Sequence, residues 1–297
     1  TDLLQIVSDG IPPAEIRSVR IYLQDDSGAL PKEPSFERVL PENSAAYDIA
    51  DVRPTPGEEL LLLQLDQVAI LSLAKADQPI LAIDLEGAPS VGTRGDERGM
   101  DRLQMVYPRK NKPDWIRIPT FKGLLVLNST GDTAGLLNSG GRANFYVPQK
   151  PGLAFIESDI QIFYDAPHVS TGDINGDGRE DLLSATRHEV LAFHQKPDGT
   201  FASDPNQKLP LRLITPEDHI RGSGGIVVEG EDVNGDALMD LLVTKLSGGF
   251  SNSRTETRIY LNREGTWDLQ KPDRSYASES TVGLDRLIDL DSDGRPE

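Results

Sequence analysis

The sequence predicts an all-β fold, and three observations lead to that prediction. Short apolar runs rich in Val, Ile and Leu alternate with turn signals along the chain. No segment keeps the 3.6-residue apolar period of a helix together with helix caps. The pattern of strands and turns also recurs about every 57 residues, and four short strands at such a period are typical of propeller blades. We therefore expect a β-propeller of four-stranded blades, about five of them in this chain.

The repeat is measured from an acidic residue that stands before an apolar strand in each unit. These anchor residues are Asp2, Glu59, Asp114, Asp181, Asp240 and Glu297, separated by 57, 55, 67, 59 and 57 residues. They define five units of a single propeller domain that covers residues 1–297. The expected blades are approximately residues 2–58, 59–113, 114–180, 181–239 and 240–297.

Each unit continues with a second β-rich run, and in most units a turn signal follows it. The second runs are residues 19–23, 68–71, 123–127, 190–193 and 257–261. The turn signals include Asp26-Ser-Gly28, Thr130-Gly-Asp132, Asp198-Gly-Thr-Phe201 and Glu264-Gly-Thr-Trp267. Strand, turn and strand at this spacing predict antiparallel meanders.

Two arrangements of the five units are consistent with the repeat. The units can close into a ring, with residues near Asp2 supplying the strand that would follow Glu297. Alternatively, they form part of a longer propeller of six to eight blades. Because the last unit stops at the final acidic residue of a repeated motif, we favour the longer propeller.

An acidic loop precedes two of the anchored strands and recurs at the end of the sequence. Residues 172–183 read Gly-Asp-Ile-Asn-Gly-Asp-Gly-Arg-Glu-Asp-Leu-Leu, with oxygen-bearing side chains at loop positions one, three, five and nine. The spacing recurs from Asp232 and from Asp289. Side chains at these positions of a tight loop can face one centre, and Gly178 permits the positive φ that closes the loop. Ca²⁺ prefers such all-oxygen shells.

The helix–loop–helix calcium motif does not describe these loops. That motif needs a bidentate Glu at position twelve, where the first loop has Ser184 followed by a strand-like sequence. The shorter loop, with its last ligand at position nine before a strand, resembles the FG-GAP / VCBS repeats of calcium-binding β-propellers, which include integrin-α-like repeats. The specific motif covers residues 172–183, 231–242 and 288–297.

The resemblance implies two to three Ca²⁺ ions, each held by one loop. The implied ligands of site one are Asp173, Asn175, Asp177, Arg179 (by its carbonyl) and Asp181. Those of site two are Asp232, Asn234, Asp236, Leu238 (by its carbonyl) and Asp240. Those of site three are Asp289, Asp291, Asp293, Arg295 (by its carbonyl) and Glu297. Two residues depart from the pattern, because Ala237 replaces the turn glycine and Glu297 is longer than Asp.

The loop that closes the first unit lacks this ligand set. Residues 51–59 carry Arg53 and Thr55 at two of the ligand positions. A guanidinium repels a cation, so we expect this loop to be structural only.

Composition restricts the partners. The formal net charge of −18 argues against binding to nucleic acid or to anionic membrane surfaces, and no apolar run is long enough for membrane insertion. The chain has no cysteine, which excludes disulfides and thiolate chemistry. Weak calcium sites, with Kd of about 10⁻⁴–10⁻³ M, fill outside the cytosol. We therefore expect an extracellular, cell-surface or periplasmic protein.

The expected function is that of a non-catalytic module that binds a protein or glycan, with Ca²⁺ as its cofactor and no catalytic residues. Arg94-Gly-Asp96 matches a cell-adhesion tripeptide. One alternative is a carbohydrate-active enzyme like the polysaccharide lyases, for which Arg109, Lys110 and Lys112 form the visible basic cluster. A second alternative is a structural subunit of a larger surface assembly.

Overall fold

In the computed structural model, the regular secondary structure of the described residues is β-sheet. The described residues are 2–10, 16–41, 44–53, 57–64, 66–73, 80–85, 89, 100–107, 115–128, 130–140, 142–146, 161–165, 167–213, 225–247 and 254–279. Their regular elements are all strands, which confirms the all-β prediction for this part of the chain. Within the same residues, no helix is long and apolar enough to cross a membrane.

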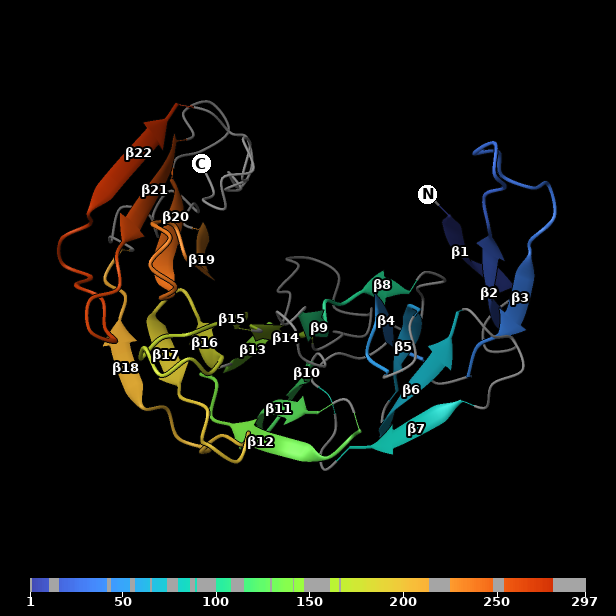
Figure 1. Cartoon of the computed structure of the whole chain (residues 1–297), viewed down its shortest axis with the longest axis horizontal. Helices are drawn as coiled ribbons and strands as arrows, with labels where there is room; N and C mark the ends of the chain where they lie inside the picture. Colours follow the sequence, from blue (N-terminus) through green and yellow to red (C-terminus); the bar gives the residue numbers. More distant parts are fainter. Residues whose placement is uncertain are drawn as a thin grey trace, which may run out of the picture. The chain divides into compact units, whose positions relative to one another are not determined.

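Figure 1 labels the strands of the described residues in the order in which they occur along the chain. The first eleven are β1 (Leu3–Asp9), β2 (Ile16–Tyr22), β3 (Phe36–Val39), β4 (Ala46–Ala50), β5 (Glu59–Leu63), β6 (Gln67–Ser72), β7 (Leu81–Asp84), β8 (Asp101–Arg102), β9 (Val106–Tyr107), β10 (Trp115–Thr120) and β11 (Gly123–Leu127). The remainder are β12 (Thr133–Leu137), β13 (Arg142–Tyr146), β14 (Gln161–Asp165), β15 (His168–Gly172), β16 (Asp181–Ala185), β17 (Glu189–Phe193), β18 (Gln207–Pro210), β19 (Gly225–Glu231), β20 (Asp240–Ser247), β21 (Arg254–Tyr260) and β22 (Arg274–Ser278).

Most of the sheets are antiparallel meanders. Their strand orders are β1-β2-β3, β7-β6-β5-β4-β8, β12-β11-β10-β9, β13-β14, β15-β16-β17-β18 and β19-β20-β21-β22. The pairing of β4 with β8 is parallel and covers two residues of each strand. The anchored strands β5, β16 and β20 begin at Glu59, Asp181 and Asp240, as predicted.

The chain forms two compact units, which we call unit 1 (residues 1–133) and unit 2 (residues 134–297). In unit 1, one core cluster joins the sheet of β2 to the sheet of β5 and β6. Its buried members are Val19, Ile21, Leu40, Leu60, Leu62, Ala69, Leu71 and Met100. Residues 60–63 of β5 are all buried, so this strand is covered on both of its faces. That burial explains its continuous run of leucines.

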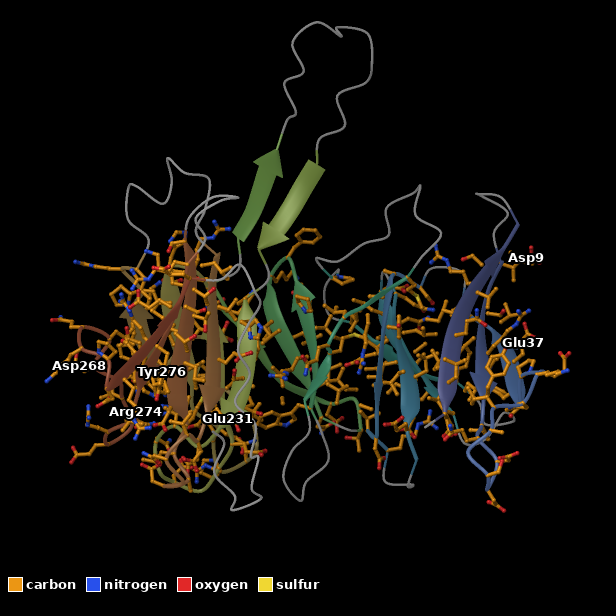
Figure 2. All side chains as sticks on the ribbon, turned by 90° about the horizontal axis from the view of Figure 1, so that it is seen from above. Asp9, Glu37, Glu231, Asp268, Arg274 and Tyr276 are labelled. Atoms are coloured by element: carbon orange, nitrogen blue, oxygen red, sulfur yellow. The ribbon has the colours of Figure 1, made fainter. Side chains whose placement is uncertain are left out.

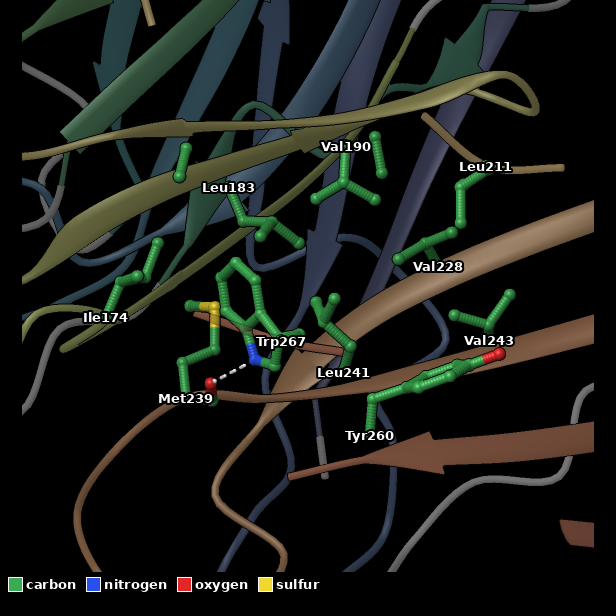
Figure 3. Close-up of a cluster of buried hydrophobic side chains, with 12 residues drawn as sticks. Ile174, Leu183, Val190, Leu211, Val228, Met239, Leu241, Val243, Tyr260 and Trp267 are labelled. Carbon is green, nitrogen blue, oxygen red and sulfur yellow. Dashed lines mark hydrogen bonds between the residues drawn. The ribbon is translucent and has the colours of Figure 1, made fainter. Parts of the chain in front are cut away.

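The core of unit 2 lies between its two four-stranded sheets (Figure 3). Leu183 and Val190 come from the first sheet, while Val228, Leu241 and Tyr260 come from the second. The strands β16 and β20 are buried over residues 181–185 and 240–244. The outermost strand, β22, is exposed along its length, and its Tyr276 is 57% exposed (Figure 2).

The two four-stranded sheets of unit 2 run over residues 168–210 and 225–278. The predicted blade limits at residues 181 and 240 therefore fall between the first and second strands of a sheet. The acidic loops at residues 173–180 and 232–239 consequently each join two neighbouring strands of one sheet.

Candidate metal centre

Loop one (residues 173–180) joins β15 to β16, and loop two (residues 232–239) joins β19 to β20. Strand register fixes the ends of both loops, because Gly172 pairs with Asp181 and Glu231 pairs with Asp240. The two loops therefore have equal length and equal attachment to their sheets. Their equivalent positions can be compared residue by residue.

The first carboxylate of loop one organises the loop around itself. Asp173 Oδ1 accepts a hydrogen bond from the Gly176 N–H at 2.7 Å, and Oδ2 accepts one from the Gly178 N–H at 2.7 Å. Asn175 Oδ1 accepts the Asp177 N–H at 3.0 Å. Positions one and three of the predicted site thus turn toward the backbone of their own loop.

Loop two repeats these contacts. Asp232 Oδ1 accepts a hydrogen bond from the Gly235 N–H at 2.8 Å, and Oδ2 accepts one from the Ala237 N–H at 2.9 Å. Asn234 Oδ1 accepts the Asp236 N–H at 2.8 Å. The spacing of polar residues in the sequence therefore corresponds to a shared loop conformation.

Positive φ angles close both loops at the same positions. Gly176 and Gly178 have φ of 78° and 76° in loop one, and Gly235 has φ of 77° in loop two. Ala237, at the position of Gly178, has φ of 71°. A left-handed conformation is unfavourable for a residue with a Cβ by about 1–2 kcal/mol, so loop two is strained at Ala237.

Exchanging glycine and alanine at the equivalent positions 178 and 237 is expected to change the stability of unit 2 in opposite directions. A Cβ on Gly178 would have no atom within 4 Å, so Gly178→Ala adds backbone strain alone and is expected to destabilise unit 2 by about 1 kcal/mol. Ala237→Gly is expected to stabilise it by about 0.5 kcal/mol, because the greater freedom of Gly in the unfolded chain offsets part of the gain. Chemical denaturation of both variants checks this. Equal signs for the two substitutions would contradict it.

The carboxylate at position nine of loop one is buried. Asp181 Oδ1 accepts the Gln195 N–H at 2.8 Å, and Oδ2 accepts the Ile174 N–H at 3.1 Å. Burial raises the pKa of Asp181 above its ordinary value, and the charge of Asp177 adds to that rise, while the two N–H donors oppose it. The carboxylate therefore lies in a site that favours a neutralising partner.

Asp240 occupies the same place in loop two and is also fully buried. Its Oδ1 accepts the Asn262 N–H at 2.7 Å, and its Oδ2 accepts the Val233 N–H at 3.1 Å. Burial raises the pKa of Asp240 to about 6, and the charges of Asp236 and Asp232 contribute to the rise. The negative charges of Asp232 and Asp236 therefore disfavour the ionised form of Asp240.

Position seven distinguishes the two loops electrostatically. The guanidinium of Arg179 forms an ion pair with Asp177, and its Nε donates to the carbonyl oxygen of Gln195 at 2.9 Å. Leu238 stands at this position in loop two. Loop one therefore carries a positive side chain that offsets part of its negative charge, whereas position seven of loop two supplies none.

The donor chemistry of both loops fits a hard cation. Each loop, together with the aspartate that follows it, offers three aspartate carboxylates, one asparagine amide oxygen and backbone carbonyls, which are hard oxygen donors. Among the described residues, no three His, Cys, Asp or Glu side chains are already gathered as a metal-binding group. The loop carboxylates instead face N–H groups of the chain.

Other predicted residues lie outside the part of the chain that the structure describes. These are the five ligands of site three, Asp289, Asp291, Asp293, Arg295 and Glu297, together with the tripeptide at residues 94–96 and the basic cluster of Arg109, Lys110 and Lys112.

The loop in unit 1 that lacks the ligand set keeps one contact of the acidic loops. Glu59 Oε2 accepts the Val52 N–H at 3.0 Å and the Arg53 N–H at 3.3 Å. Burial raises the pKa of Glu59, while these two N–H donors and the charge of Arg53 oppose the rise. Arg53 Nη2 donates to the carbonyl oxygen of Ile70 at 3.0 Å. A positive side chain of the protein thus accompanies the buried carboxylate here.

The sequence analysis missed Gln195 and Asn262, which bind the position-nine carboxylates. Each is a buried polar residue that stands two positions after the end of a strand, β17 or β21. A polar residue two positions after the third strand of a sheet is therefore a sequence signal for the group that binds the position-nine carboxylate.

Comparison with family sequence models supports the predicted resemblance. Residues 173–243 match the FG-GAP-like repeat, and this range includes loop one and loop two together with β16 to β19 and the first half of β20. A search of curated proteins gave no significant match. The segment 173–243 of this chain is therefore similar to the FG-GAP-like repeat family.

Proposed function

We propose that the chain is a non-catalytic, calcium-stabilised β-propeller module that binds a protein or glycan partner outside the cytoplasm. One observation carries the proposal: two acidic loops of the same conformation each end in a buried carboxylate, Asp181 or Asp240, at the start of a buried strand. A bound ion would neutralise each loop and fix it to that strand.

Five residues of each loop would hold the ion. In loop one these are Asp173, Asn175, Asp177, Asp181 and the carbonyl of Arg179, and in loop two they are Asp232, Asn234, Asp236, Asp240 and the carbonyl of Leu238. When bound, Ca²⁺ would supply positive charge and oxygen coordination. Its role would be to stabilise the folded state by mass action. Residues 289–297 would form the third site.

The propeller part of the proposal rests on how sheets stack inside each unit. In unit 1 and in unit 2, neighbouring sheets share an apolar core, and β5, β16 and the first five residues of β20 are buried on both faces. Blades of a propeller have this arrangement, because each blade is covered by its neighbours. About five blades in this chain, as a ring or within a longer propeller, are consistent with the repeat.

The proposed cellular location rests on the calcium affinity typical of weak sites, and the proposed partner class rests on the net charge of the chain. Weak calcium sites, with Kd of about 10⁻⁴–10⁻³ M, would be filled at the Ca²⁺ concentrations found outside cells. A net charge of −18 disfavours nucleic acid and anionic membranes. Proteins and glycans remain as the partner classes, and loop faces of propellers commonly carry such sites.

Calcium titration of loop variants tests the metal assignment. Asp177→Ala and Asp236→Ala are each expected to remove one bound ion, because each deletes a carboxylate from one loop only. Asp268→Ala, at an exposed turn of unit 2, serves as the control and is expected to leave stoichiometry unchanged. Calorimetric titration of chelator-treated protein, with metal analysis, measures the number of ions. Unchanged stoichiometry in both loop variants would refute the assignment.

A further inference from the structure

Asn262 connects loop one to loop two. Its side-chain Nδ2 donates to the carbonyl oxygen of Ile174 at 2.9 Å and to that of Met239 at 3.1 Å. Its backbone N–H donates to Asp240 Oδ1 at 2.7 Å, and its Oδ1 accepts the Gly265 N–H at 3.0 Å. Asn262 is only 4% exposed. One buried residue thus contacts the second position of loop one and the carboxylate that follows loop two.

Met239 provides a second link between the loops. Its backbone N–H donates to the carbonyl oxygen of Asp173 at 2.7 Å, so the last residue of loop two is bonded to the first residue of loop one. Its carbonyl oxygen also accepts Trp267 Nε1–H at 3.0 Å (Figure 3). The Met239 side chain lies against Gly172 and Gly230, where an added Cβ would be 2.9 Å and 2.4 Å from its nearest atom. Close packing therefore holds Met239 in place.

These contacts form a continuous path between the two buried carboxylates. Asp240 binds the N–H of Asn262, the amide of Asn262 binds the carbonyl of Ile174, and the N–H of Ile174 binds Asp181. A displacement of one carboxylate would therefore displace the other through Asn262 and Ile174. Every bond in the path joins buried groups, where a shift cannot be absorbed by solvent.

We propose that Asn262 couples the two loops, so that they bind divalent cations with positive cooperativity. This inference rests on the proposed function, since it requires both loops to bind Ca²⁺. An ion in loop two would order Asp240 and hold Asn262, and Asn262 would keep Ile174 in the position that orients Asp181. Asp181 would then already be oriented before an ion binds to loop one, so that binding there would cost less conformational entropy.

Gln195 is the equivalent residue of the first sheet and does not make the bridge. Its backbone N–H donates to Asp181 as that of Asn262 donates to Asp240. Its side-chain Nε2 instead donates to the carbonyl oxygen of Gly199 at 3.3 Å, within its own hairpin. Gln195→Ala therefore removes a similarly buried amide without touching the path, and it is the matched control for Asn262→Ala.

Site-resolved titration of the full chain tests the coupling. The amide resonances of Gly178 and Gly235 report Ca²⁺ binding to loop one and to loop two, respectively. Asp236→Ala is expected to weaken binding at loop one by about fivefold or more, and Asp177→Ala to weaken binding at loop two by the same factor, because coupling is reciprocal. This comparison leaves Asn262 intact, so it does not depend on whether an Asn262 variant folds.

Asn262→Ala and Gln195→Ala then test the residue itself. In the Asn262→Ala background, the affinity of each loop is expected to be independent of substitution in the other loop, whereas Gln195→Ala keeps the reciprocal effect. Binding at both loops with no reciprocal effect would overturn the coupling and leave the proposed function standing. Failure of both resonances to respond to Ca²⁺ would overturn the proposed function and the coupling together.

Discussion

Replacing Trp267 with alanine is expected to destabilise unit 2 by about 3–5 kcal/mol, which is typical of deleting a buried aromatic side chain. Trp267 lies in the core between the two four-stranded sheets and is 4% exposed (Figure 3). Its loss opens a cavity beside Met239 and removes the indole N–H that bonds the Met239 carbonyl. Urea denaturation with hydrogen exchange at β20 measures the effect on unit 2.

Trp267→Phe separates the two contributions. It keeps an aromatic ring in the core but loses the N–H donor and part of the indole volume, while Asn262 still donates to the same carbonyl oxygen. We expect a loss of about 1 kcal/mol for this variant. Equal losses for the alanine and phenylalanine variants would show that packing of Trp267 does not hold the sheets together.

Replacing Asp48 with alanine is expected to destabilise unit 1 by about 3 kcal/mol or more. Asp48 is buried on β4, and its Oδ2 accepts the N–H groups of Met105 and Val106 at 2.8 and 2.9 Å. Alanine leaves both buried donors without this acceptor. Amide exchange at residues 105 and 106, together with denaturation of the variant, measures the loss.

Arg102→Ala is the control for Asp48. Arg102 Nε donates to Asp48 Oδ1 at 3.1 Å, but the arginine side chain is 59% exposed. Only the arginine end of this ion pair faces solvent, where its charge is screened, so this variant is expected to lose less stability than Asp48→Ala. If both variants lost equal stability, the hydrogen bonds from the N–H groups of Met105 and Val106 would not be the main contribution of Asp48 to stability.

The strands that sequence reasoning located best are those buried on both faces. Residues 60–63 and 181–185 form near-continuous apolar runs after an acidic residue, and such runs are visible without any tertiary information. The first strand of each sheet was harder to place. β15 reads His-Val-Ser-Thr-Gly, which has no apolar run, so only its register with β16 shows that the sheet begins there.

The acidic loops were predictable because their contacts are local. Asp173 bonds residues three and five positions ahead, and the need for positive φ at residue 178 follows from the same short segment. The bridging role of Asn262 depends on contacts with residues 88 and 23 positions away. No pattern within a repeat contains that information, because it arises where two sheets pack together.

A thermal melt of the full chain with Ca²⁺, with Mg²⁺ and with a chelator tests the calcium-stabilised fold most directly. At about 10 mM Ca²⁺, a hundredfold excess over a Kd of about 10⁻⁴ M, each filled loop would add about 2.7 kcal/mol. Two loops are then expected to raise the melting temperature of unit 2 by about 10 °C. Mg²⁺ should give a much smaller rise, because it demands a tighter octahedral shell. Equal melting temperatures in Ca²⁺ and in chelator would contradict calcium stabilisation and leave the acidic loops as solvated turns.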